Sequence, residues 1–423
     1  MPVNSGNVLS LTFPDGASYA NMTSYEALLK EYYGPQVVHN LVYTNNPGFA
    51  MLPKHPEVSG LVYPLPVIFG NPQGRSATFT NAQGNQTASA NTRFILQMAA
   101  DYQLVTVTGM TAAASRNDQG AFVSALKNEM DNGFKQIKNS ISGAIFRSGT
   151  GSIGKIATGG ITSGVITLSN PDDVTQFEVN QTLQANATDG GTPRATLGYV
   201  IGVDRGSGIV TVSDTGLGGA AGTPVAWQAA DFLLVQGDNN LKVKGFNAWL
   251  PATVTATPFF GVDRTGDATR LGGIRWDGSG QPIEEALVKA AALCSREDGN
   301  PTTVVLPFSS YSSLELSLGS KVQYTDRFVD DVVIPFRGIR LHGPNAELAI
   351  FPDRSCIAQT AFMLETDSWG LYSYGEVPHI VDLDVGSAIL RVPSADAFEV
   401  RLRYFAQMGC NAPGHNARVT LSA

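Results

Sequence analysis

The apolar residues between positions 118 and 147 recur at intervals of three and four, and this pattern predicts the longest helix of the chain, Asp118–Arg147. The spacing keeps them on one face, as in a helix that packs on a core along its length. Ser115-x-x-Asp118 in front of the run matches a capping box. At 1.5 Å per residue the helix would be about 45 Å long and could act as a beam. The stripe consists of Phe122, Leu126, Met130, Phe134, Ile137, Ile141 and Ile145.

The segment Leu61–Gly70 is predicted to be extended, because its two prolines remove ladder donors and bias the residues before them toward β geometry. The same prolines exclude a central strand. A polar stretch, Arg75–Asn91, separates this segment from a second extended run, Phe94–Val107, and together they predict a long hairpin. Two strands alone are marginally stable in water. If the hairpin projects, we expect a neighbouring molecule to bury its apolar side chains.

The N-terminal residues 1–53 carry short apolar patches separated by prolines and predict an arm rather than a domain. Within them only Ser24–Tyr33 has the pattern of a short helix, which ends at Gly34-Pro35. The start of the chain lacks the basic residues and apolar run of a secretory signal. No apolar run reaches the roughly 18 residues that span a bilayer. We therefore expect neither export nor membrane insertion.

Residues 150–240 change to short β-branched runs between turn-forming residues and predict an inserted all-β domain. One hairpin in it is specific, with Leu197–Val203 returning as Ile209–Val212. After a Gly-, Arg- and Asp-rich connection, an amphipathic helix is predicted to begin at Pro282 and to open a mixed α+β domain over residues 281–390. The inward face of this helix is predicted to hold Ile283, Leu287, Ala291 and Cys294.

The last segment alternates strictly between apolar and charged residues and predicts a half-buried strand. A turn at Asn411–Gly414 then leads to Val419–Leu421, so the pattern predicts an antiparallel hairpin. The apolar face of the first strand would hold Phe398, Val400, Leu402 and Tyr404.

The composition describes a large folded chain with much weakly polar surface. Its 423 residues exceed the roughly 250 to 300 at which single cores stop growing, so several domains are expected. Only 15% of residues are charged, and the net charge of -8 argues against a nucleic-acid binder, which would concentrate Lys and Arg. The three cysteines are odd in number and widely spaced, which predicts no disulfide framework or thiolate site and favours synthesis in a reducing cytosol.

Motifs with possible chemistry are weak. Gly149–Lys155 matches G-x-G-x-x-G, but a helix precedes it and β-like sequence follows, the reverse of what a phosphate loop needs. The histidines are isolated. Pairs of aspartates at 172–173, 330–331 and 382–384 could hold a cation or act on glycosides, yet they lie beside turns, where caps and solvated charges are commoner. We predict no catalytic residue, no cofactor and no metal site.

The order of these elements, from arm to hairpin, long helix, mixed domain and C-terminal strands, resembles the plan of tailed-bacteriophage major capsid proteins of the Hong Kong 97 type. Three stretches also resemble that family, and the likeness covers nearly the whole chain apart from 150–240. They are Tyr63-Pro-Leu-Pro-Val-Ile-Phe-Gly-Asn-Pro-Gln-Gly-Arg-Ser-Ala-Thr-Phe79, Gly261-Val-Asp-Arg-Thr265 with Thr269-Arg-Leu-Gly-Gly-Ile-Arg275, and Tyr404-Phe-Ala-Gln-Met-Gly-Cys-Asn-Ala-Pro-Gly414.

The resemblance implies an α+β Hong Kong 97-type capsid fold with an inserted all-β domain. The implied parts are an N-terminal arm at 1–53, an E-loop at 54–106, a peripheral domain with a spine helix at 107–149, the β-rich insertion at 150–240, a peripheral-domain connection at 241–280, an axial domain at 281–390 and a C-terminal peripheral hairpin at 391–423. Family members that crosslink use a Lys in the E-loop, but none lies between Lys54 and Lys127, so no crosslinking is expected.

The function implied is that of a non-enzymatic shell subunit in the virion, assembled in the host bacterial cytoplasm. Copies would form hexamers and pentamers around double-stranded DNA without binding its sequence. The partners implied are a portal, a decoration protein and a scaffold protein, which is expected to be a separate chain because the arm is short. No proteolytic trimming is expected. We predict intersubunit contacts at Leu65, Val67, Phe69, Arg75, Phe79, Arg264, Arg270 and Arg275.

Two other classes stay open. A cellular encapsulin compartment would have a similar fold but would hold enzymes instead of DNA. A secreted β-rich carbohydrate-active protein or adhesin would suit the glycine and asparagine content, but it should carry an export signal and a concave acidic and aromatic site. The sequence shows neither.

Overall fold

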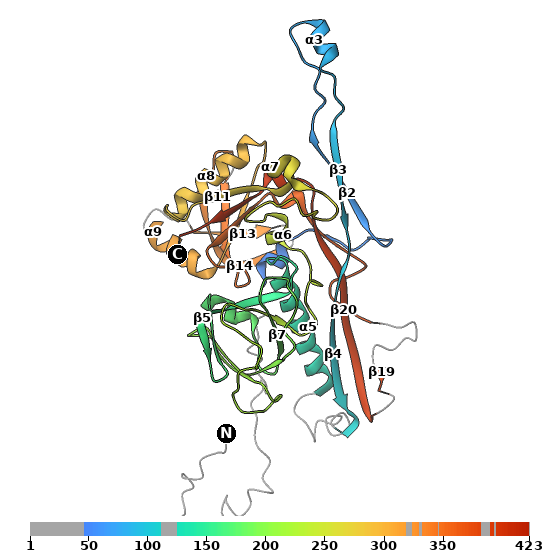
Figure 1. Ribbon diagram of the computed structural model, residues 1–423, viewed down its shortest axis with the longest axis vertical. Coiled ribbons are helices and arrows are strands. Elements are labelled where there is room, and N and C mark those ends of the chain that lie inside the picture. The colour runs from blue at the N-terminus through green and yellow to red at the C-terminus, as the bar shows by residue number, and fades with distance from the viewer. Residues whose placement is uncertain are drawn as a thin grey trace, which may run out of the picture.

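The computed structural model describes residues 46–110, 125–318, 324–329, 332–345, 347–381, 390–392 and 395–422. The predicted arm up to residue 45, its helix Ser24–Tyr33 and the capping box at Ser115 lie outside these residues. Two sheets and a barrel form the body, and a thin hairpin rises from it (Figure 1).

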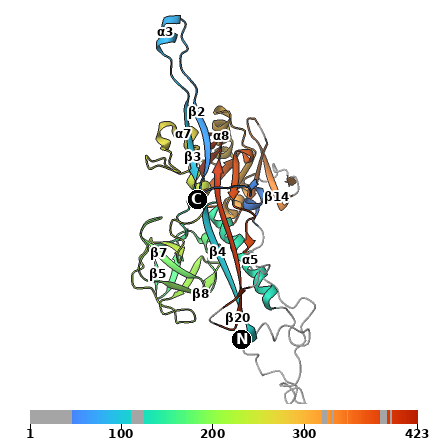
Figure 2. The same ribbon diagram turned by 90° about the vertical axis from the view of Figure 1, so that its right-hand side faces the viewer.

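The first sheet has six strands and is organised around β20 (Ala397–Cys410), which pairs with β4 (Ala99–Thr108) over ten residues. On its other edge β20 pairs with β17 (Trp369–Ser373), β18 (His379–Ile380) and β19 (Leu390–Arg391), and β1 (Lys54–His55) adds to β17. Figure 2 shows β4 and β20 descending side by side.

Helix α5 (Ala125–Ala144) packs on β4, as its apolar stripe predicts: Ile137, Ile141 and Ile145 are buried. The described helix has 20 residues, which corresponds to about 30 Å. It ends before the predicted Arg147, because the amides of Phe146 and Arg147 bond to carbonyls three residues back and tighten the last turn.

The second sheet has seven strands, and α8 (Ile283–Arg296) and α9 (Phe308–Leu318) pack on it. Pro282 directly precedes α8, and all four predicted inward residues of this helix are buried, which confirms that face. In order, the strands are β11 (Ile274–Asp277), β21 (Ala417–Thr420), β16 (Thr360–Leu364), β12 (Thr303–Leu306), β15 (Glu347–Pro352), β14 (Val332–His342) and β13 (Tyr324–Val329).

Two predicted strand pairings are wrong. The run Phe94–Val107 does not continue one hairpin: β3 (Ala90–Leu96) pairs with β2 (Tyr63–Gly70), whereas β4 pairs with β20. The C-terminal hairpin is absent, because β20 and β21 belong to different sheets and the turn at η5 (Pro413–His415) passes the chain between them. Alternation of polarity shows which face of a strand is buried, but it does not specify the partner strand.

Residues 152–235 form a closed barrel with its own core, including Phe177, Val200 and Leu233. The predicted hairpin is present as β8 (Gly198–Asp204) and β9 (Ile209–Ser213). The other strands are β5 (Ser152–Thr162), β6 (Val165–Leu168), β7 (Thr182–Asn186) and β10 (Phe232–Val235). The barrel contacts the body through polar groups: the Arg147 and Asp173 side chains are 2.5 Å apart, and Ser309 Oγ donates to Asp172 Oδ2.

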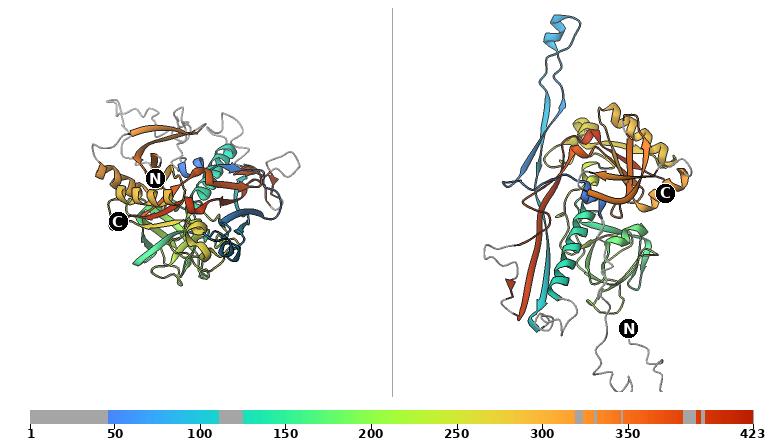
Figure 3. Two further views of the ribbon diagram at one scale, coloured as in Figure 1. Left: turned by 90° about the horizontal axis from the view of Figure 1, so that it is seen from above. Right: turned by 180° about the vertical axis from the view of Figure 1, so that it is seen from behind.

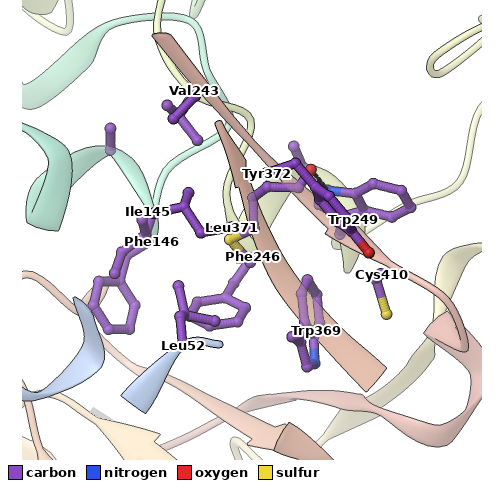
Figure 4. Packing of buried hydrophobic residues seen from close by; sticks show 14 of the residues in the cluster. Leu52, Ile145, Phe146, Val243, Phe246, Trp249, Trp369, Leu371, Tyr372 and Cys410 are labelled. Atoms are coloured by element: carbon purple, nitrogen blue, oxygen red, sulfur yellow. Dashed lines mark hydrogen bonds between the residues drawn. The ribbon is translucent and has the colours of Figure 1, made fainter. Parts of the chain in front are cut away.

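The largest core lies where the six-stranded sheet, α5 and the loop region 243–262 meet. Figure 4 shows the Phe246 ring between Phe146 and Trp369, with Leu52 beside it and Trp249 farther to the right, so the core joins segments that are far apart in the sequence. The indole Nε1 of Trp249 donates to the Met408 carbonyl, so its one polar atom is satisfied in the core.

The short helix α2 (Pro47–Met51) is held to this core by a buried carboxylate. Asp353 Oδ2 accepts from the Gly48 amide at 2.9 Å, and Oδ1 accepts from the Ser355 amide at 2.8 Å. Burial raises the pKa of the Asp353 carboxyl above its usual 3.8, although these amides and Arg354 oppose the shift. The folded chain therefore binds this proton more tightly than the unfolded chain.

We expect Asp353→Asn to flatten part of the pH dependence of stability. The raised pKa of Asp353 adds to the free energy of unfolding. This addition is complete below pH 3.8 and is lost as the pH rises through the pKa of the folded chain, because ionising the carboxyl costs more in the folded chain than in the unfolded one. Urea unfolding in steps from pH 3.5 upward measures this difference between variant and parent. Exposed Asp367→Asn is the control and should keep the parent's slope. Equal slopes for all three chains would contradict the expectation.

Candidate intersubunit interface

The β2–β3 hairpin carries a tip that stands clear of the body in the side views (Figures 1 and 2, and the right-hand view of Figure 3). Its register pairs Leu65 with Phe94 and Val67 with Thr92. Beyond the strands, the Thr87 amide donates to the Gln73 carbonyl at 2.8 Å, and the short helix α3 (Phe79–Gly84) closes the end. The tip is therefore ordered by bonds within itself, without support from the body.

The root of the hairpin is covered by its own chain. Leu65 is 4% exposed and packs in the main core with Phe94 and Leu96. Val67 and Phe69 are partly buried against the same core. The prediction that a second molecule buries Leu65 is thus wrong: this face of β2 turns toward the body, and the opposite face turns outward.

The outward face and the tip hold exposed apolar side chains. Ile68 on β2 is 70% exposed, Phe79 at the tip is 81% exposed, and Arg75 is exposed on the same tip; Leu61, two residues before β2 at the root end, is 90% exposed. The structure thus leaves Phe79 and Arg75 of the predicted contacts available. Sequence reasoning missed Leu61 and Ile68, although strict alternation along β2 places Ile68 opposite Leu65, Val67 and Phe69.

Arg264 does not lie at the surface, where the predicted contact with another subunit would need it. It is 6% exposed, its Nη1 donates to the carbonyls of Ala248 and Trp249, and its guanidinium lies 4.2 Å from the Phe259 ring centre. Burial, with Arg275 nearby, lowers the pKa of Arg264 to about 10. The predicted role as a contact with another subunit is therefore wrong for this residue, because its guanidinium already contacts carbonyls and a ring of its own chain.

Arg270 and Arg275 also contact their own chain. Arg275 donates to the carbonyls of Ala268 and Gly272 and is partly buried. Arg270 donates to the Phe69 carbonyl at 2.8 Å, yet its side chain keeps 54% exposure. Of the three arginines, Arg270 is the one whose exposure leaves it accessible to a second molecule.

A polar cavity of about 460 Å³ lies between α5, β4 and the barrel. On its wall Lys242 Nζ donates to Asp101 Oδ2 at 2.7 Å and Asp238 Oδ2 at 3.0 Å, while Ser140 and Tyr404 donate to Asp101. Burial raises the pKa of Asp238, and the two carboxylates outweigh burial to raise that of Lys242. The ammonium therefore stays charged, and the cluster joins the body to the base of the barrel.

Other reactive groups in the described residues are buried or dispersed. Burial raises the pKa of the Cys294 and Cys410 thiols to about 12, which leaves them un-ionised at neutral pH. The glycines of Gly149–Lys155 lead from α5 into strand β5, without a following helix. Within these residues no group of three or more His, Cys, Asp or Glu is placed to hold a metal ion. In the same residues, every helix is too short or too polar to cross a bilayer.

Comparisons with known proteins give matches at the level of structure. No family model and no curated protein matches the sequence. The cyanophage A-1(L) capsid asymmetric unit matches with a TM-score of 0.56 and 11% identity over 94% of this chain and 98% of that one. The capsid of the native GTA particle gives 0.51 and 9% over 96% and 100%. The holo-SrpI encapsulin from Synechococcus elongatus PCC 7942 gives 0.48 and 6% over 96% of both chains. This chain has the fold of bacteriophage capsid proteins.

Proposed function

We propose that this chain is a structural subunit of an icosahedral bacteriophage capsid, which assembles into hexamers and pentamers around double-stranded DNA. The observation that carries the proposal is the hairpin, whose tip projects without cover in the subunit and which exposes the apolar side chains of Ile68 and Phe79. Its position in a fold shared with phage capsid proteins supports the same conclusion. The subunit is a building block and performs no catalysis.

In this proposal the tip lies on an adjacent copy and buries Phe79 and Ile68 there. Arg75 is the one charged residue between Gly70 and Ala90, and it offers a forked donor to a carboxylate of the neighbour. The parts are then an N-arm, an E-loop formed by the β2–β3 hairpin, a peripheral domain with α5 as spine helix, and an axial domain built on α8 and α9; β4, which the sequence-based boundaries put in the E-loop, belongs to the six-stranded sheet. The barrel is an insertion that adds residues without interrupting these parts.

The charge of the barrel suits a position on the shell wall. Eight acidic and three basic residues lie between residues 150 and 240, so this region supplies -5 of the chain's net charge of -8. A wall without a basic patch lets DNA enter and leave without adhering. The scaffold, portal and any decoration protein are separate chains in this proposal.

Replacing the two exposed apolar side chains of the hairpin tests the proposal. Ile68→Thr with Phe79→Ser should leave the unfolding transition of the subunit unchanged, because both side chains are exposed in it. Each lost burial weakens a contact by about 1.5 to 3 kcal/mol. The concentration needed for shells, measured by sedimentation and electron microscopy, should therefore rise roughly tenfold or more.

The matched control is Val225→Ser, which removes an equally exposed apolar side chain, 92% exposed, from the barrel. It should assemble like the parent chain. If the hairpin variant also forms shells at the parent's concentration, the tip makes no contact that matters and the proposal loses its main support.

An encapsulin-like compartment is the second candidate, because the fold alone serves both roles. The content of particles purified from producing cells separates the two. Nuclease-protected double-stranded DNA of uniform length is expected for a capsid, and a co-purifying enzyme without such DNA is expected for a compartment.

A further inference from the structure

Two hydrogen bonds join the hairpin to the segment that follows the main-core loop, one on each strand. On β2, the Phe69 carbonyl accepts from Arg270 Nη1 at 2.8 Å. On β3, the Ile95 amide donates to the Phe260 carbonyl at 2.9 Å. Both partners belong to the segment 259–273, so a single piece of chain holds the two strands of the hairpin.

The turn at Phe259–Val262 has an unusual sequence for its geometry. Phe259 and Val262 bond to each other in both directions, and the residues between them have positive φ, +49° at Phe260 and +83° at Gly261. Two-residue turns of this kind favour Asn-Gly, and a bulky aromatic residue in the left-handed region is strained. A phenylalanine that is retained despite this backbone strain is expected to do more than close the turn.

The ring of Phe260 supplies that role. It is 9% exposed and lies 4.6 Å from the Phe259 ring and 5.7 Å from the Trp249 ring, centre to centre. The ring therefore fixes the turn to the main core, while the strained backbone directs the Phe260 carbonyl at the Ile95 amide. Asn at this position would close the turn but would not anchor it.

The buried arginines support the same segment from below. Arg264 joins the turn to the Ala248 and Trp249 carbonyls and lies over the Phe259 ring. Arg275 bonds to the Ala268 and Gly272 carbonyls at the two ends of α7 (Ala268–Gly272), the short helix that carries Arg270. Each arginine of the group thus helps to hold the hairpin.

We propose that Phe260 and Arg270 are positioning residues that fix the angle at which the hairpin projects, and that this angle selects the size of the shell. The second part rests on the proposed function. A long hairpin converts a small rotation at residues 69 and 95 into a large displacement of its tip. Subunits whose hairpins project at one fixed angle would assemble with a single shell curvature. Subunits whose hairpin angle varies would assemble with several.

Arg270→Ala tests the anchor on β2 with little risk to folding, because the side chain is 54% exposed. Phe260→Asn tests the anchor on β3, because it keeps a residue that the turn favours and removes the ring. Arg296→Ala is the matched control: its side chain is 69% exposed and pairs with its neighbour Glu297, away from the hairpin. All four full-length chains are expressed and their particles are sized by electron microscopy.

We expect both hairpin variants to form shells with a diameter distribution at least twice as wide as that of the parent, and the control to match the parent. Equally narrow distributions for Arg270→Ala and Arg296→Ala would overturn the link to shell size.

The angle itself is measured by pulsed electron spin resonance between labels at Ser89→Cys and Ala292→Cys. Both positions are exposed, whereas the native cysteines are buried. The distance distribution should broaden in Arg270→Ala and Phe260→Asn alone, and an unchanged distribution would overturn the anchor. If the parent forms no shells, the proposed function fails, while the spin labels still decide the anchor.

Discussion

Lys242→Met is expected to lower the free energy of unfolding by about 3 to 5 kcal/mol, because it leaves two carboxylates in the body without their cation. Lys242 Nζ lies 2.7 Å from Asp101 and 3.0 Å from Asp238, and the three side chains are between 11% and 22% exposed. Urea unfolding at pH 7 measures the loss. A partial recovery is expected when Asp238→Asn is added, because one of the two uncompensated charges is then removed.

Lys289→Met is the control for this experiment. Its ion pair with Glu285 is about half exposed, and such pairs contribute about 0 to 1 kcal/mol. A Lys242→Met chain that unfolds within 1 kcal/mol of this control would mean that water screens the cluster through the adjacent cavity.

Trp249→Ala is expected to cost about 3 to 5 kcal/mol, because a cavity opens where the body and the hairpin root share one core. The Trp249 ring lies 4.9 Å from the Phe94 ring of β3 and 5.0 Å from the Phe259 ring of the turn, centre to centre. The substitution also removes the hydrogen bond that Trp249 Nε1 donates to the Met408 carbonyl. Chemical unfolding followed by far-ultraviolet circular dichroism reports the loss.

Val225→Ala is the matched control, since its side chain is 92% exposed and should change stability by less than about 0.5 kcal/mol. Trp249→Phe should fall between the two, because it keeps part of the ring and loses the hydrogen bond. A Trp249→Ala chain as stable as the control would show that the core collapses around the missing ring.

Local periodicity predicted the elements whose signal lies within one segment. The inward face of α8, the stripe of α5 and the β8–β9 hairpin all follow from residues three, four or two positions apart. Strand partners are not encoded in this way. β4 has the same alternation whether it continues β3 or pairs with β20, and the choice depends on contacts about 300 residues away.

The candidate contacts divide for the same reason. Phe79 and Arg75 lie on the tip, where no distant segment covers them, so both stay available for the predicted contact. Leu65 and Arg264 contact residues from elsewhere in the chain: Leu65 pairs with Phe94, and Arg264 donates to the Trp249 carbonyl. The charge of Arg264 indicated a surface residue. Its burial depends on aromatic rings and carbonyls from other segments, which the local sequence pattern does not predict.

The two ends of the barrel leave the body side by side. The Asn240 amide donates to the Thr150 carbonyl, the Gly245 amide donates to the Arg147 carbonyl, and β5 and β10 pair where the barrel closes. A module held by such adjacent ends can be gained, lost or exchanged in one genetic event, since a short bridge across the seam restores the path of the chain. The same seam is a natural place to graft a foreign folded unit onto each copy.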